Sequence, residues 1–202
     1  MCLPRLIRAL SALFLLVALA ACDAKDMADA PHPMGNFKMN ANFIDAKKAQ
    51  TLPLSRDATP EEWEAVLKAA MQERFGPYTG DKLFEFGISI DGYILAPPGV
   101  PVVASPSSAL IIRVHVYDTA SKKFLEEGGK RMVVLEGVSK DSVIGSGWTQ
   151  NKNAQMKKMA RNAAKAVQDY MLEHPEWLGL PPLQTPTPAQ TSATGDPVSK
   201  RN

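Results

Sequence analysis

Two segments in the middle of the chain alternate between apolar and polar residues, and this pattern requires a β-sheet with one buried face. Between Leu83 and Leu95 the apolar set is Phe84, Phe86, Ile88, Ile90 and Ile94, and the polar set is Glu85, Ser89, Asp91 and Tyr93. Residues 110–117 repeat the pattern, with Leu110, Ile112, Val114 and Val116 against Arg113, His115 and Tyr117. Successive side chains of a strand point to opposite faces, so each segment predicts a strand with one face in the core and one in water.

Further strands are expected on either side of this pair. Residues 118–122 read as a turn into a third strand from Lys122 to about Val138. Gly128 and Gly129 predict a bulge or bend within it, because glycine weakens the interior of a strand. The patchy alternation of residues 36–44 indicates a possible additional strand at the N-terminal end.

Two amphipathic helices flank the expected strands. Thr59 is suited to the N-cap, Pro60 to the first helical position, and Glu62 completes a capping box before Gly76-Pro77 ends the helix. Its apolar residues follow helical spacing and form one stripe: Trp63, Val66, Leu67, Ala70, Met71 and Phe75. A second helix starts near Asn151 and ends at His174-Pro175, with an apolar face of Met156, Met159, Ala160, Ala163, Val167, Tyr170 and Met171.

These elements predict one α+β domain over residues 36–179. The expected architecture is an antiparallel meander of three to four strands, with both helices packed on one face and the other face half open to water. Residues 180–202 are rich in Pro, Thr, Ser and Ala without apolar periodicity, which predicts a disordered tail. Residues 22–35 read as a flexible tether in front of the domain.

The first 21 residues have the parts of an export signal: Arg5 and Arg8, an apolar run from Ala9 to Ala18, and small residues before Cys22. Leu19-Ala20-Ala21-Cys22 resembles the lipobox of bacterial lipoproteins. Ordinary secretion with cleavage after Ala18-Leu19-Ala20 is the alternative. The resemblance implies that Cys22 becomes lipidated and anchors the protein to a membrane, since two or more acyl chains give stable attachment. Asp23 resembles an inner-membrane retention signal, so the inner membrane is favoured over the outer.

The predicted body is similar in outline to small, uncharacterised lipoproteins of Gram-negative bacteria. The likeness lies in a hairpin followed by a terminal helix that contains Arg161-Asn162-Ala163-Ala164-Lys165. It implies a protein facing the periplasm, and those families offer no catalytic residues to transfer to this chain.

Charge and cysteine content narrow the functional classes. Removal of the signal takes away Cys2 and two arginines, which leaves 21 basic residues (23 less 2) against 21 acidic ones. A neutral chain without a basic run offers no electrostatic footprint for nucleic acid. With Cys22 lipidated the body has no free thiol, and three scattered histidines show no metal-ligand spacing, so we expect no metal and no cofactor.

Two regions are candidate sites. The open sheet face could bind a ligand through Tyr93, Arg113, His115 and Tyr117, with Asp91 or Glu85 opposite; an ordinary solvated face is the competing interpretation. The second region is the long loop 96–106, whose prolines favour extended, preorganised backbone. It could bind a partner through Pro97, Pro98, Val100, Pro101, Val102 and Val103, or it could fold back over the core.

Three functional hypotheses follow. The first is a non-catalytic interaction or assembly module that binds a protein partner in the cell envelope. The second is a lipoprotein that binds a small ligand or assists transport. The third, an envelope hydrolase, finds little support, because Ser146 between Gly145 and Gly147 does not form the GxSxG elbow of hydrolases.

Overall fold

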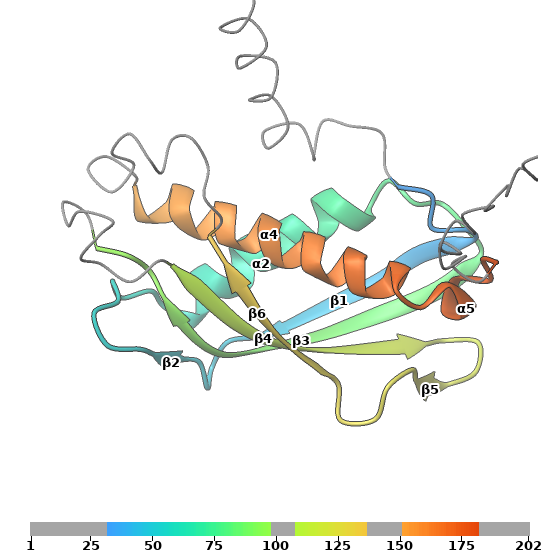
Figure 1. The fold of residues 1–202 in the computed structure, drawn as a ribbon, viewed down its shortest axis with the longest axis horizontal. Coiled ribbons are helices and arrows are strands. Elements are labelled where there is room, and N and C mark those ends of the chain that lie inside the picture. Colours follow the sequence, from blue (N-terminus) through green and yellow to red (C-terminus); the bar gives the residue numbers. More distant parts are fainter. Residues whose placement is uncertain (1–31, 98–107, 137–150, 182–202) are drawn as a thin grey trace, which may run out of the picture.

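The computed structural model describes residues 32–97, 108–136 and 151–181. Within them the order is β1 (Phe37–Asp45), β2 (Gln50–Thr51), α2 (Pro60–Phe75), β3 (Lys82–Ile94), β4 (Ala109–Asp118), β5 (Lys123–Phe124), β6 (Lys130–Leu135), α4 (Lys152–Leu172) and α5 (Pro175–Leu178). The fold is α+β, and both long helices lie on the same side of a single twisted sheet (Figure 1). No helix in these ranges is both long enough and apolar enough to cross a membrane.

The sheet is mixed and six-stranded, which corrects the expected antiparallel sheet of three to four strands. β3, β4 and β6 form the predicted antiparallel meander. However, β1 and the short β2 both pair with β3 in parallel. The chain between β1 and β3 passes through α2, and a helical crossover of this kind returns the chain in the same direction.

The predicted third strand is divided into two pieces. β5 and β6 both pair with β4, and residues 125–129 lead from one to the other. Gly128 and Gly129 lie in this connection with φ angles of 79° and 70°, the left-handed region that favours glycine. The predicted bend at these glycines is therefore confirmed.

The capping box at the start of α2 is confirmed. The Thr59 side chain accepts a hydrogen bond from the Glu62 backbone N–H at 3.2 Å, and the Thr59 N–H donates to the Glu62 carboxylate at 2.8 Å. Lys152, at the start of α4, forms an ion pair with Glu62 at 2.6 Å. The same carboxylate thus fixes the N-terminus of α2 and joins it to α4.

One core lies between the sheet and the two helices. From α2 it takes a stripe spaced by four residues, Trp63, Leu67, Met71 and Phe75, each fully buried. Phe75 stacks on Phe86 of β3 with ring centres 5.1 Å apart. α4 contributes Ala160, Ala163 and Ala164, small side chains that allow α4 to approach the other elements closely. Met34 and Leu180 also pack on this core, so the packed region extends slightly beyond residues 36–179 at both ends.

Candidate functional site

We define the outer face as the side of the sheet turned away from α2 and α4 (Figure 1). In β4 the residues Leu110, Ile112, Val114 and Val116 are buried on the helix side, and the residues between them are half-buried on the outer face. Arg113, His115 and Tyr117 therefore share the outer face, as the alternation predicted. No described element covers this face, so its side chains are accessible within the part of the chain that the structure describes.

Large apolar side chains are exposed on the outer face. Phe43 of β1, Phe124 of β5, and Val133 and Leu135 of β6 are 58–63% exposed. Each is placed there by register or by a ring contact: Phe43 pairs with Gly87, Phe124 contacts His115, Val133 pairs with Ile111, and Leu135 pairs with Ala109. Leu54, the other exposed large apolar residue of the described ranges, lies in the connection after β2. Exposed apolar groups gathered on one surface are typical of sites that bind another molecule.

An aromatic cluster forms one end of this surface. The Phe124 ring lies 5.3 Å from the Tyr117 ring and 5.9 Å from the His115 ring, both in edge-to-face geometry. Gly129 closes the cluster from the other side, because a Cβ at this position would come within 2.6 Å of the His115 imidazole. The three rings thus hold one another in place on the surface, and the Phe124 ring remains largely open to solvent.

A charged group lies beside the aromatic cluster. Asp91 Oδ2 is 3.5 Å from Arg113 Nη2 and 3.6 Å from Arg131 Nε, so one carboxylate oxygen faces two guanidinium groups. Of the two acids expected opposite the patch, Asp91 is the one that lies beside Arg113. Glu85 pairs in register with Tyr117 and accepts a hydrogen bond from Asn40 at 2.7 Å. Sequence reasoning did not include Arg131, because its place depends on how β6 pairs with β4.

Tyr93 does not belong to the outer face, which corrects its placement in the predicted ligand patch. The register between β3 and β4 shifts between Ile90 and Gly92, and such a bulge reverses the alternation beyond it. Tyr93 is consequently 2% exposed, with its ring centre 5.2 Å from that of Trp63. Its hydroxyl accepts from the Ala58 N–H at 3.0 Å and donates to the Ala58 carbonyl at 2.9 Å. Tyr93 therefore holds the connection in front of α2 against the sheet.

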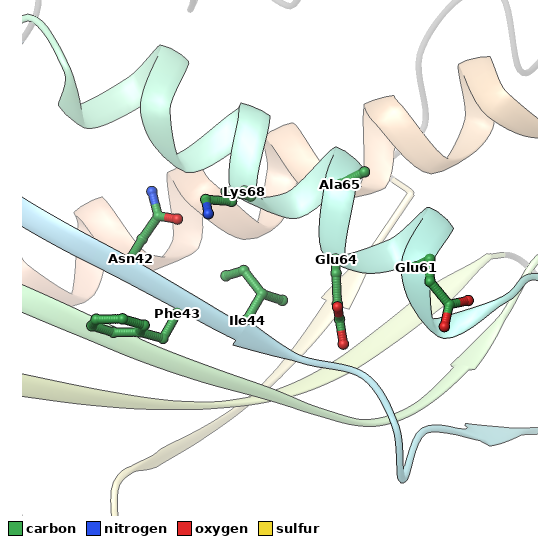
Figure 2. A pocket seen from close by; sticks show the side chains of 7 residues that line it. All are labelled: Asn42, Phe43, Ile44, Glu61, Glu64, Ala65 and Lys68. Atoms are coloured by element: carbon green, nitrogen blue, oxygen red, sulfur yellow. The ribbon is translucent and has the colours of Figure 1, made fainter.

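A hollow lies along the free edge of β1, beneath α2 (Figure 2). It has a volume of about 400 Å3 and is lined by Asn42, Phe43, Ile44, Glu61, Glu64, Ala65 and Lys68. Hydrogen bonds from its own backbone N–H and from Thr59 lower the pKa of Glu61, so this carboxylate stays ionised. We call this hollow the edge groove. No sequence motif indicates this groove, because it is formed where the edge strand β1 lies next to α2.

The predicted partner-binding loop lies mostly outside the described residues. This applies to Pro98, Val100, Pro101, Val102 and Val103, whereas Pro97 is described and half-buried. The two ends of the loop are joined by Ser108, whose side chain accepts hydrogen bonds from the Ala96 N–H at 3.1 Å and from Gln155 Nε2 at 2.8 Å. Cys22 and Asp23 also lie outside the described residues. The roles expected for the loop, for Cys22 and for Asp23 remain predictions.

The described residues contain no group of side chains suited to hold a metal ion. Within residues 32–97, 108–136 and 151–181, no three His, Cys, Asp or Glu side chains are grouped closely enough to hold a metal ion. His32 and His174 lie away from the outer face: the His32 carbonyl accepts from the Tyr78 hydroxyl, and His174 contacts Glu176 at 2.9 Å. His115 is accordingly the histidine that faces solvent on the outer face, among aromatic rings.

No protein-family model matches the sequence, and no curated protein resembles it significantly. Several solved structures resemble the fold. A Xanthomonas campestris protein of family DUF330 has a TM-score of 0.42 and 9% identity, over 71% of this chain and 90% of its own. A "putative lipoprotein" of Caulobacter crescentus has a TM-score of 0.33 and 13% identity, over 66% and 91%. A "putative neuraminyllactose-binding hemagglutinin homolog" of Helicobacter pylori has a TM-score of 0.31 and 9% identity, over 75% and 94%.

Proposed function

We propose that this chain is a lipoprotein of the bacterial cell envelope that acts as a non-catalytic interaction module. In this proposal Cys22 carries the lipid anchor, and Asp23 favours retention at the inner membrane. The outer face then docks a protein partner. The observation that carries the proposal is the concentration of exposed Phe43, Phe124, Val133 and Leu135 on this single face.

The exposed apolar side chains of the outer face would be stabilised if a partner removed them from water. Each is more than half exposed, so a partner that covered them would remove substantial apolar area from water, at about 25 cal/mol for each Å2. The aromatic cluster and the arginines beside it have the composition of interface cores, which are enriched in Tyr, Phe and Arg. A monomer gains no stability from leaving these groups in solvent, so their grouping favours a docking role.

Anchoring is tested by blocking signal peptidase II in the producing cells. We expect the unprocessed precursor to accumulate, because lipoprotein signals are cut by this enzyme at the residue before the cysteine. The Cys22→Ala variant serves as the control, since it removes the acceptor thiol and should release the protein from the membrane fraction. Normal processing during the block would refute the lipoprotein assignment.

Docking is tested by cross-linking in intact cells and capture of the complexes from membranes. Leu135→Asp places a charge among the exposed apolar side chains of the proposed interface and should abolish cross-linking to the partner. Leu54→Asp is the matched control, because Leu54 is 74% exposed in the connection between β2 and α2, outside the strands of the proposed interface, and aspartate tolerates its φ of 65°. Equal recovery of the partner with both variants would show that the outer face is not the docking surface.

A ligand-binding role is the second candidate, and the edge groove is the observation that favours it. Its volume of about 400 Å3 falls in the range of small-molecule pockets. Lys68 and the ionised Glu61 on its rim offer opposite charges for a polar ligand. Thermal shifts produced by small molecules in the wild type but not in an Ala65→Trp variant, which fills the groove, would support this role over docking.

A further inference from the structure

We propose that Arg113 and Arg131 together bind an acidic side chain, aspartate or glutamate, of the docked protein partner. This inference rests on the proposed docking role of the outer face and names the chemistry that the partner must bring. The register of the sheet brings the two arginines together. Arg113 of β4 and Arg131 of β6 are direct cross-strand partners, so their side chains lie next to each other on the same face.

Two like charges placed directly opposite each other on a sheet are destabilising. Asp91 relieves part of this repulsion, but one carboxylate cannot neutralise two guanidinium groups. Its Oδ2 lies 3.5 Å and 3.6 Å from the two arginines, beyond the usual 2.7–3.2 Å of an N–H···O bond. The pair therefore keeps one uncompensated positive charge, and no other hydrogen bond engages these two guanidinium groups within the described part of the chain.

Apolar side chains surround the arginine pair, so a docked partner would remove the uncompensated positive charge from water. Along β4, Ile111 and His115 lie on either side of Arg113, and along β6 Val133 follows Arg131 on the outer face. A partner that covers the apolar groups also excludes water from the arginines. Exclusion of water strengthens a charge pair that is formed and penalises a charge left unpaired, so partners with a carboxylate at this position are favoured.

The charge balance of the face favours a protein carboxylate over the headgroups of an anionic membrane. The outer face of β1, β3, β4 and β6 carries three bases and three acids, namely Lys38, Arg113, Arg131, Asp45, Glu85 and Asp91. Attraction to an anionic bilayer grows with each surplus basic residue, and here there is no surplus. A local pair of arginines within a neutral, partly apolar face instead fits one carboxylate at a defined place.

The test is photo-cross-linking from position 133 in the full-length chain, carried out in the cells that produce it. Val133 is 58% exposed and adjoins Arg131, so a photoreactive residue there should capture the partner. Arg131→Glu and the milder Arg131→Gln should each reduce the cross-linked product about tenfold or more, because a charge-assisted hydrogen bond is lost. Arg161→Glu is the matched control: Arg161 on α4 has the same 53% side-chain exposure and also forms an ion pair, with Glu73 at 3.0 Å.

The outcomes separate this inference from the docking role on which it rests. The inference is supported if both Arg131 variants lose the cross-linked product and Arg161→Glu keeps it. If the acidic residue of the partner at the cross-link is changed to arginine, the product with Arg131→Glu should be restored. Undiminished cross-linking by the Arg131 variants would overturn the acidic-residue inference while leaving docking intact. Absence of any protein cross-link from position 133, with capture from the α4 surface instead, would overturn both. Cross-linking to lipid alone would identify a membrane in place of a protein.

Discussion

Val114 and His115 are neighbours in β4, yet they belong to two surfaces with different physical demands. Val114 is 1% exposed in a core formed with Trp63, Phe86 and the alanines of α4. His115 lies among aromatic rings on the outer face, where Phe124 remains 58% exposed. On the inner face, apolar side chains stabilise the fold because the helices cover them. On the outer face, the same kind of side chain contributes little to the fold and remains available for a partner.

A matched pair of phenylalanine substitutions gives the largest expected effect on this comparison. Phe86→Ala should lower the free energy of unfolding by about 3–5 kcal/mol, because it opens a cavity where Phe86 stacks on Phe75. Phe43→Ala, at a ring that is 63% exposed on the outer face, should change it by only about 0.5 kcal/mol. Chemical denaturation of both variants measures the difference. Similar losses in the two variants would mean that the outer face also holds the fold together.

Two tyrosines sharpen the comparison at a smaller scale. Tyr93→Phe keeps the ring but leaves the half-buried Ala58 N–H without its acceptor, so we expect a loss of about 1–2 kcal/mol. Tyr117→Phe should leave stability unchanged, since Tyr117 lies on the outer face beside the exposed Phe124. Thermal unfolding of the two variants checks the prediction. A neutral Tyr93→Phe variant would contradict the burial of the hydroxyl by the bulge.

These tyrosines also show where sequence reasoning succeeds and where it ends. β4 alternates without interruption, so its pattern predicted which residues are buried and placed Arg113, His115 and Tyr117 on one face. The same rule placed Tyr93 on that face too, and there it was wrong. The bulge at Gly92 belongs to the pairing of β3 with β4, and the alternation within β3 alone does not reveal it.

Long-range pairing accounts for the remaining differences. The strand expected near residues 36–44 exists, but its parallel pairing with β3 is a property of the crossover through α2 and not of its own residues. The chain bends at Gly128 and Gly129, so that both β5 and β6 pair with β4. This pairing brings four further residues to the outer face: Phe124, Arg131, Val133 and Leu135. The bend was predictable from the glycines, whereas the partners it brings to Arg113 and His115 were not.

The smallest predicted effect on stability concerns Glu62, which joins α2 to α4 in the helical layer that covers the inner face of the sheet. Hydrogen bonds from Lys152 and from the Thr59 N–H lower the pKa of the Glu62 carboxyl. A carboxyl whose pKa is lowered by folding stabilises the protein above its ordinary pKa of 4.5, and this stabilisation disappears as the pH falls through the lowered value. Glu62→Gln can still accept the capping hydrogen bond but cannot pair with Lys152, so it should cost about 0.5 kcal/mol at neutral pH.

Unfolding curves of the wild type and Glu62→Gln from pH 7 to pH 3 measure this contribution. The gap between the two proteins should be constant near neutrality and should close at the acid end, where Glu62 becomes protonated. Lys152→Met provides the control, because it removes the same ion pair from the α4 side and should show the same pH dependence. A gap that does not narrow as the pH falls below 4.5 would show that the charge of Glu62 does not contribute to stability. In that case α2 and α4 would be held together over the inner face by packing and not by charge.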